Sequence, residues 1–125
     1  MTPQTKANAP KHVCEYCGAA ADSRDHIVPV SYATTVRYFN AQSYVWACRE
    51  CNSMLGDRMV LTVEDRAVQC GLLLRKRYSK LLAMPDWTEE ELSDIGHRLR
   101  GDIEAALAER DIIRGRIAKC HRKRS

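Results

Sequence analysis

Two motifs of identical spacing, Cys14-Glu15-Tyr16-Cys17 and Cys48-Arg49-Glu50-Cys51, decide the fold of this chain. Each Cys-x-x-Cys turn directs two sulfurs toward one point, so the two turns together can satisfy the four tetrahedral positions of a zinc ion. Such a site is closed, because no coordination position is left for a water molecule. We therefore predict a structural zinc held by Cys14, Cys17, Cys48 and Cys51, and any chemistry must come from other residues.

The composition is that of one small domain. A chain of 125 residues with 45% apolar content supports a modest core, which a structural metal would supplement. Six cysteines are also compatible with three disulfides, but Met1 to Lys11 is polar and offers no apolar signal segment. We therefore expect reduced thiols and a cytoplasmic location. Membrane insertion is not expected, because no apolar run approaches the ~20 residues of a membrane span.

Local patterns predict strands in the first half and helices in the second. Residues 23–28 and 43–47 have the composition of short strands, and a helix is expected to open at Cys48 and run to about Met54. Residues 31–42 fit a helical turn or a loop equally well. The chain is thus expected to be α+β, with a flexible arm (1–11), a zinc core (12–60), a helical hairpin (61–118) and a basic tail (119–125).

The helical hairpin has recognisable start and stop signals. A capping signal at Thr62 opens a helix that is expected to continue to Pro85, and Thr88-Glu89-Glu90-Glu91 is a fuller capping box. Apolar residues at three- and four-residue steps then predict a long amphipathic helix with a break near Gly96 or Gly101. Its apolar stripe offers a surface for a homodimer.

The residues between and after the cysteine pairs resemble a known family. The run Asp25-His26-Ile27-Val28-Pro29, then Ala47-Cys48-Arg49-Glu50-Cys51-Asn52 and Gly56-Asp57-Arg58, resembles the HNH endonucleases, also called ββα-metal nucleases. Many of their cores carry a four-cysteine zinc in a treble-clef-like arrangement. The chain is most similar to phage and mobile-element enzymes of the recombination endonuclease VII type. The resemblance covers residues 14–58 and implies a metal-dependent DNA endonuclease.

The resemblance also implies a role for three residues. Asp25 and Asn52 would bind a catalytic Mg²⁺ or Mn²⁺ ion, for which carboxylate and amide oxygens are suitable hard ligands. His26 would be the general base that activates water, since an ordinary imidazole is largely neutral near pH 7. Successive side chains on a strand point to opposite faces, which favours different roles for Asp25 and His26. One such site per chain would cut one strand. Asn52 can also be interpreted as a helix N-cap.

Two positions depart from the common pattern of the family. Ser43 stands where many relatives have asparagine, with Asn40 and Gln42 nearby as substitutes, and Leu55 stands where many have histidine or lysine. These departures put the rate and the metal preference in question. A zinc-structured DNA-binding module without catalysis is the principal alternative, and a zinc-stabilised protein-interaction adaptor is a third. Neither gives a reason for Asp25, His26 and Asn52 to occur together.

The positive charge is clustered. The net charge is only +4, but one cluster lies in the second half and another near the C-terminus. Clustered positive charge suits a DNA phosphate backbone, whereas a solvated helix face is the simpler interpretation. Candidate nucleic-acid contacts are Arg24, Arg49 and Arg58 in the core and Arg75, Lys76, Arg77 and Lys80 in the first cluster; the second cluster contains Arg114, Arg116, Lys119, Arg122, Lys123 and Arg124.

Three further residues are expected to be structural or peripheral. Cys70 is predicted to be a helix core thiol, Cys120 an exposed tail thiol and His97 a helix-surface residue. His12 lies beside the first cysteine turn and is a conceivable replacement ligand, although four thiolates already complete the site.

Overall fold

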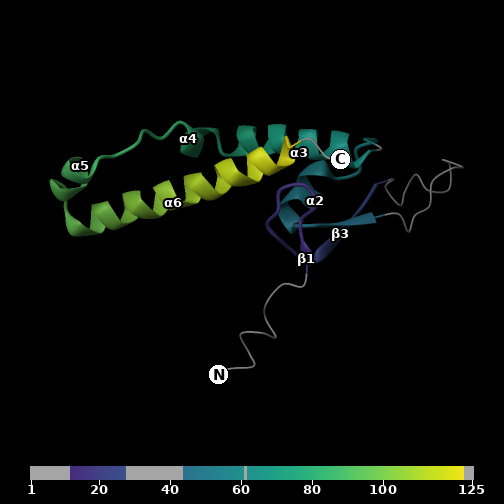
Figure 1. Cartoon of the computed structure of the whole chain (residues 1–125), viewed down its shortest axis with the longest axis horizontal. Helices are drawn as coiled ribbons and strands as arrows, with labels where there is room; N and C mark the ends of the chain where they lie inside the picture. The colour runs from purple at the N-terminus through teal and green to yellow at the C-terminus, as the bar shows by residue number, and fades with distance from the viewer. Residues whose placement is uncertain (1–11, 28–43, 61, 123–125) are drawn as a thin grey trace, which may run out of the picture.

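The computed structural model describes residues 12–27, 44–60 and 62–122, and it has short strands followed by helices (Figure 1). This order confirms the predicted small α+β fold with a long C-terminal helix. The expectations for the arm 1–11, the strand end at Val28, the segment 31–42, Ser43 and residues 123–125 lie outside the described residues.

Two small antiparallel hairpins form the first half. β1 (His12–Val13) pairs with β2 (Ala20–Ala21) and encloses the first cysteine turn, where Gly18 has a φ of 80° that most residues avoid. β3 (Ser23–His26) pairs with β4 (Tyr44–Ala47), so that the described strands match the two predicted ones closely. In this register Asp25 lies opposite Val45, and His26 lies opposite Tyr44.

The second cysteine pair opens a helix, as predicted. α2 (Arg49–Leu55) has Cys48 as its N-cap, and the Cys48 sulfur accepts a hydrogen bond from the backbone N–H of Cys51. Asn52 therefore lies inside the helix, and the alternative in which it caps the helix is excluded.

α3 (Val63–Arg77) is shorter than the sequence predicts. Its start is confirmed, because the Thr62 hydroxyl accepts a hydrogen bond from the backbone N–H of Asp65. The predicted continuation to Pro85 is wrong: the helix ends at Arg77, with Tyr78 as its C-cap, and is followed by the short α4 (Ser79–Leu82). Tyr78 donates its hydroxyl to Glu50 at 2.6 Å, so a tertiary contact coincides with the break.

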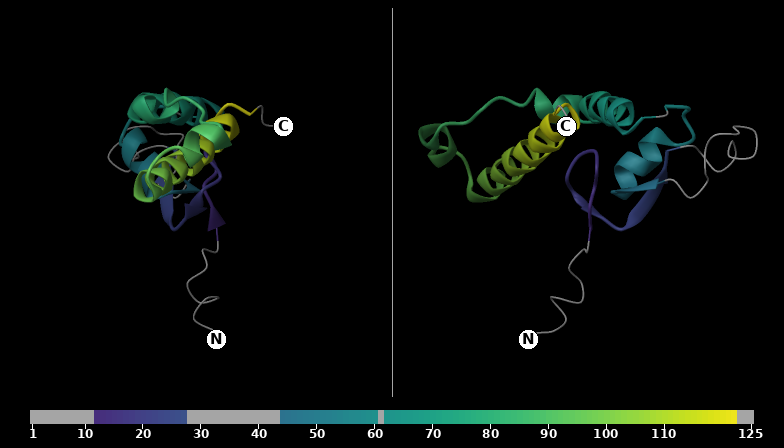
Figure 2. Two further views of the ribbon diagram at one scale, coloured as in Figure 1. Left: turned by 90° about the vertical axis from the view of Figure 1, so that its left-hand side faces the viewer. Right: turned by 45° about the vertical axis from the view of Figure 1, so that its right-hand side comes forward.

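The last two helices follow the predicted capping signals. α5 (Glu89–Ser93) has the reciprocal capping box between Thr88 and Glu91, and Gly96 is the N-cap of α6 (His97–Cys120). The break near Gly96 is thus confirmed. α6 continues beyond residue 118, into the predicted basic tail, and runs antiparallel beside α3 (Figures 1 and 2). The connection between them is longer than a simple hairpin turn, because it includes α4 and α5.

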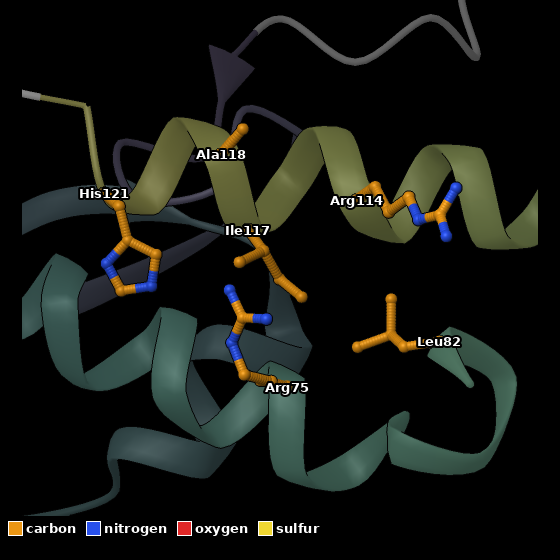
Figure 3. Close-up of a pocket in the computed structure, with 6 residues that line it drawn as sticks. All are labelled: Arg75, Leu82, Arg114, Ile117, Ala118 and His121. Atoms are coloured by element: carbon orange, nitrogen blue, oxygen red, sulfur yellow. The ribbon is translucent and has the colours of Figure 1, made fainter.

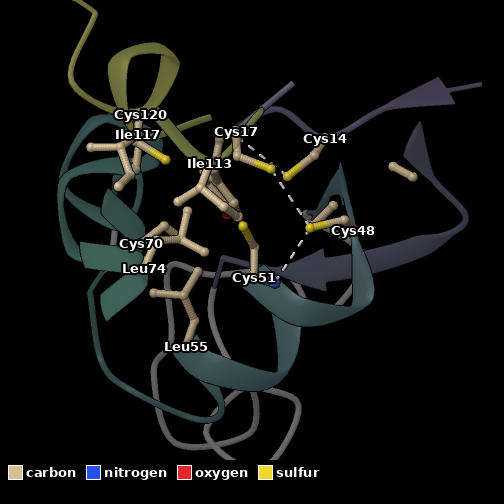
Figure 4. Packing of buried hydrophobic residues seen from close by; sticks show 14 residues of the cluster. Cys14, Cys17, Cys48, Cys51, Leu55, Cys70, Leu74, Ile113, Ile117 and Cys120 are labelled. Carbon is tan, nitrogen blue, oxygen red and sulfur yellow. Dashed lines mark hydrogen bonds between the residues drawn. The ribbon is translucent and has the colours of Figure 1, made fainter. Parts of the chain in front are cut away.

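The two halves share one core, centred on the cysteines (Figure 4). The prediction for Cys120 is wrong: it is 1% exposed, and burial raises the pKa of its thiol to about 12. Cys70 is buried, as predicted, and His97 is exposed at the start of α6, also as predicted. The core members are Cys14, Tyr16, Cys17, Ala21, Ala47, Cys48, Cys51 and Leu55 from the first half, Ala67, Cys70 and Leu74 from α3, and Ile113, Ile117 and Cys120 from α6.

The contact between α3 and α6 is closest at Gly71. A Cβ atom at this position would lie 2.5 Å from the His121 Nε2 atom and 3.1 Å from the Cys120 Cβ atom. The absence of a side chain at Gly71 therefore leaves room for the His121 ring and for the Cys120 Cβ atom at the end of α6. Among the described residues, none of the helices has the length and apolar content needed to cross a membrane.

Candidate functional site

The four predicted zinc ligands come together in the structure. The sulfurs of Cys14, Cys17, Cys48 and Cys51 all lie within 4.8 Å of one another, and all four residues are buried (Figure 4). The Cys17 and Cys48 sulfurs are 3.7 Å apart. A tetrahedron with Zn–S bonds of about 2.3 Å has edges of about 3.8 Å, so the sulfur separation fits a zinc ion. All six cysteines of the chain are free thiols.

Backbone geometry supports this metal centre. The N–H of Cys17 points at the sulfur of Cys14 at 3.5 Å, and the N–H of Cys51 points at the sulfur of Cys48 at 3.4 Å. In the part of the chain that the structure describes, this is the only group of three or more His, Cys, Asp or Glu side chains arranged to hold a metal. We conclude that the cluster is suited to a structural zinc.

Arg116 completes the surroundings of the cysteines, a role that the sequence did not reveal. Its Nε donates to the Cys17 sulfur at 3.2 Å and its Nη2 to the Cys48 sulfur at 3.6 Å. Four thiolates carry two more negative charges than a divalent zinc ion neutralises, so a guanidinium here offsets part of the excess. Burial alone would lower the pKa of Arg116, but its bonds to Cys17 and Glu50 raise it.

Glu50 connects the metal centre to both long helices. Its carboxylate pairs with Arg116 at 2.8 Å, accepts the Tyr78 hydroxyl at 2.6 Å and pairs with Arg77 at 3.0 Å. Burial would raise the pKa of Glu50, but the hydrogen bonds from Tyr78, Arg116 and Arg77 lower it. Arg77, a predicted phosphate contact, thus has an ion-pair partner within the fold, which it shares with Arg116, and its side chain is half-exposed.

Asp25, the predicted catalytic metal ligand, forms a buried ion pair with Arg66. The Arg66 Nε lies 2.9 Å from Asp25 Oδ2, and Nη2 lies 3.0 Å from Oδ1; the Tyr16 hydroxyl also donates to Oδ2 at 2.5 Å. Asp25 is 2% exposed and Arg66 is fully buried. Burial, followed by the bond to Asp25, raises the pKa of Tyr16.

Arg66 also fastens the surrounding backbone. Its Nη1 donates to the carbonyl oxygens of Val60 at 2.9 Å, Arg58 at 3.2 Å and Ile27 at 3.4 Å. The guanidinium thus ties the end of β3 to the segment between α2 and α3. Only the fold brings Arg66 to Asp25, since the two are separated by 41 positions.

His26 lies on the other face of β3 and is partly buried. Its ring is 6.3 Å from the ring of Tyr44, and the Arg24 guanidinium lies 5.2 Å from the centre of the same ring. Trp46 stands edge-on to Tyr44 and stacks on His12 at 3.8 Å. His12 is therefore occupied by an aromatic contact and is not one of the sulfur-cluster ligands.

Asn52 is attached to the predicted catalytic strand. Its amide nitrogen donates to the Arg24 carbonyl at 3.0 Å and to the Ser23 hydroxyl at 3.3 Å. These bonds use the nitrogen and leave the carbonyl oxygen as the atom suited to a metal ion. Ser23 and Asp25 are alternate residues of β3 and share a face of the strand.

The three predicted catalytic residues are thus close in the fold but do not line one pocket. A pocket of about 220 Å³ near Asn52 is lined by Ser23, Arg49, Asn52 and Ser53, and neither Asp25 nor His26 belongs to that lining. The structure places Asn52 against the strand that carries Asp25 and His26, while Asp25 points into the core.

The remaining predicted phosphate contacts fall into three groups. Arg49 pairs with Asp22 at 3.3 Å, and both side chains are exposed. Arg24 lies over Tyr44, whereas the charged groups of Arg58, Arg75, Lys76 and Lys80 are exposed and have no hydrogen-bond or ion-pair partner among residues 12–27, 44–60 and 62–122.

Comparisons with family models, with characterised proteins and with solved structures found no match for this chain. The functional conclusion therefore depends on the metal centre, the residues around it and the motifs of the sequence.

Proposed function

We propose that the chain is a zinc-structured HNH-type endonuclease that hydrolyses DNA phosphodiester bonds with one catalytic divalent cation. One observation carries the proposal: Asn52 follows zinc ligand Cys51 directly, and its amide is bonded to β3 beside Asp25 and His26. The metal centre therefore determines where α2 begins and holds Asn52 against the strand on which the other two residues lie.

His26 is the proposed general base. Its side chain lies on the face of β3 opposite that of the buried Asp25. It is partly exposed, so a water molecule near the strand end can reach the imidazole. The neighbouring Arg24 provides a positive charge for a DNA phosphate. In this proposal His26 takes the proton of the attacking water, and Arg24 and Arg58 hold the DNA backbone.

The residues fit a catalytic cation in part. A carboxylate offers about four acceptor positions, and the contacts of Asp25 with Arg66 and Tyr16 occupy three of them. By this count one position on Oδ1 remains. Because Asp25 is 2% exposed and does not line the Asn52 pocket, its carboxylate would have to turn toward Asn52 before this position and the Asn52 carbonyl oxygen could hold Mg²⁺ or Mn²⁺ together. When bound, such an ion polarises the phosphate and stabilises the leaving oxygen. Because Arg66 neutralises Asp25, we expect weak binding of this ion.

The non-catalytic DNA-binding module is the second candidate, and the same ion pair favours it. Arg66 and Tyr16 give Asp25 a full structural explanation that needs no cation. The two candidates differ in one property, since only the nuclease cleaves DNA.

Cleavage of supercoiled plasmid separates the two candidates. We expect the zinc-loaded wild type to nick DNA with Mg²⁺ or Mn²⁺, and His26→Ala to lose about two to four orders of magnitude in rate while keeping its zinc and DNA affinity. The matched control is His97→Ala, because His97 is an exposed histidine at the start of α6. Full activity of His26→Ala would refute the mechanism. A wild type that binds duplex, single-stranded and branched DNA but cuts none of them would establish the binding module.

Asn52→Ala tests the cation directly. This change leaves the atoms of the buried Asp25–Arg66 pair in place, but it also removes the two Asn52 hydrogen bonds to β3. Zinc content and thermal unfolding are therefore measured beside the metal requirement, and a higher requirement with both unchanged reflects loss of the Asn52 oxygen. We expect excess Mn²⁺ to restore part of the activity of Asn52→Ala and none of that of His26→Ala, because a metal ion cannot replace a missing proton acceptor. An unchanged metal requirement in Asn52→Ala would remove Asn52 from the site.

A further inference from the structure

A groove between α3 and the end of α6 lies outside the proposed catalytic site (Figure 3). It has a volume of about 480 Å³, which is in the size range of ligand pockets. In Figure 3, the Arg75 side chain rises from α3 toward α6, while the His121 ring hangs from the end of α6 toward α3. The lining consists of Arg75, Leu82, Arg114, Ile117, Ala118 and His121.

The polar side chains of this groove have no partner within the described part of the fold. Within the described part of the chain, the side chains of Arg75, Arg114 and His121 form no ion pair and no hydrogen bond. The nearby arginines differ: Arg77 and Arg116 both pair with Glu50. Arg77 and Arg116 thus share one carboxylate, whereas the cations of the groove have no carboxylate partner in the described residues.

The packing of the helices holds His121 in place. Its Nε2 and Cε1 atoms would lie 2.5 Å and 2.8 Å from a Cβ atom at position 71, so the imidazole lies directly against the α3 backbone at Gly71. The preceding residue, Cys120, is buried in the common core and anchors the end of α6. The His121 side of the groove is therefore held by the helix packing, which lowers the entropic cost of ordering this side chain on binding.

We propose that this groove binds a backbone phosphate of the DNA. The identity of the ligand as DNA rests on the proposed function. A guanidinium presents paired N–H donors that match phosphate oxygens, and an imidazole supplies a further N–H donor. Leu82, Ile117 and Ala118 give the groove an apolar part against which a deoxyribose can pack. The groove would add affinity at a distance from His26 without taking part in the chemistry.

The proposal distinguishes among the predicted basic residues. Arg75, together with Arg114 and His121, contacts the phosphate, whereas Arg77 is already paired with Glu50 and contributes little. Lys76 lines a different pocket, with Met54, Leu73 and Arg77. The relevant set therefore combines two segments that the sequence separates by about forty positions.

The test measures binding of a fluorescent DNA duplex over a series of salt concentrations. Each lost phosphate contact reduces the slope of log affinity against log salt by about 0.9, which corresponds to about eightfold weaker binding at 0.1 M salt relative to 1 M. Because both arginines contact the same phosphate, we expect the double variant Arg75→Gln/Arg114→Gln to show this change, Arg75→Gln and Arg114→Gln each to show a part of it, and His121→Gln to show a smaller loss of affinity. These side chains are exposed, so thermal unfolding should be unaffected.

The matched control is Arg98→Gln. Arg98 is exposed near the start of α6 and has no side-chain partner in the described residues, so this variant makes the same charge change outside the groove. Equal slopes for Arg75→Gln, Arg114→Gln and Arg98→Gln would overturn the groove while leaving the nuclease proposal intact. A wild type that binds neither duplex nor single-stranded DNA would overturn both.

Discussion

Replacing Arg116 by alanine should weaken zinc binding by about ten- to hundredfold, the usual effect of removing a group that supports metal ligands. The change removes two N–H contacts to the sulfurs of Cys17 and Cys48 and an ion pair with Glu50. A ten- to hundredfold loss corresponds to about 1.4–2.8 kcal/mol, which is about the contribution of one hydrogen bond to a charged group. The two contacts to sulfur are long, at 3.2 Å and 3.6 Å, so we expect the pair to contribute about as much as one such bond.

Zinc affinity can be measured by competition with a chromophoric chelator. Arg116→Lys keeps the positive charge but loses the planar fork that reaches both sulfurs, so it should fall between wild type and Arg116→Ala. Arg114→Ala is the matched control, because it removes the same charge from an exposed position two residues earlier on α6. It should bind zinc as the wild type does.

The outcome that refutes this reasoning is a zinc dissociation constant for Arg116→Ala within twofold of that of the wild type. The contacts of Arg116 with the two sulfurs would then contribute nothing measurable to zinc affinity. If Arg116→Ala does not fold, Arg116→Lys still decides the question, since an affinity equal to wild type would show that the contacts to two sulfurs contribute nothing.

Three further predictions concern stability, all measured by urea or thermal unfolding. Gly71→Ala should be less stable than Gly115→Ala by about 1 kcal/mol, because its new Cβ would lie 3.1 Å from the Cys120 Cβ atom and would displace the His121 ring, whereas the new Cβ of Gly115→Ala meets nothing within 4 Å. Equal stabilities of these two variants would contradict the close packing of α3 and α6. Arg66→Met should cost about 3–5 kcal/mol, since it leaves the carboxylate of Asp25 buried without its partner; a loss below 1 kcal/mol would show that the pair is not buried in solution. Removal of zinc by a chelator should lower the unfolding midpoint of a single cooperative transition that includes the helices, because α6 packs on the cysteines. A helical transition with an unchanged midpoint would show that the two halves unfold separately.

The sequence by itself determined the metal centre and the local elements. The spacing within each cysteine pair depends on one tight turn, so the ligand set follows from residues three positions apart. The capping residues Thr62 and Thr88 act within a single helical turn, and the composition of residues 44–47 is typical of a strand. These signals were sufficient because each depends on short-range geometry.

Only the tertiary structure decided which charged side chains form ion pairs and hydrogen bonds within the fold. Asp25 meets Arg66 across 41 positions, and Arg116 meets Cys17 across 99, so no local periodicity could indicate either contact. The burial of Cys120 likewise depends on α6 returning to α3 and the cysteines. A charged side chain reads the same in a sequence whether it faces solvent, a thiolate or a buried carboxylate. Its partner is chosen by the packing of distant segments, which is why the roles of Asp25 and Arg116 became visible only in the folded chain.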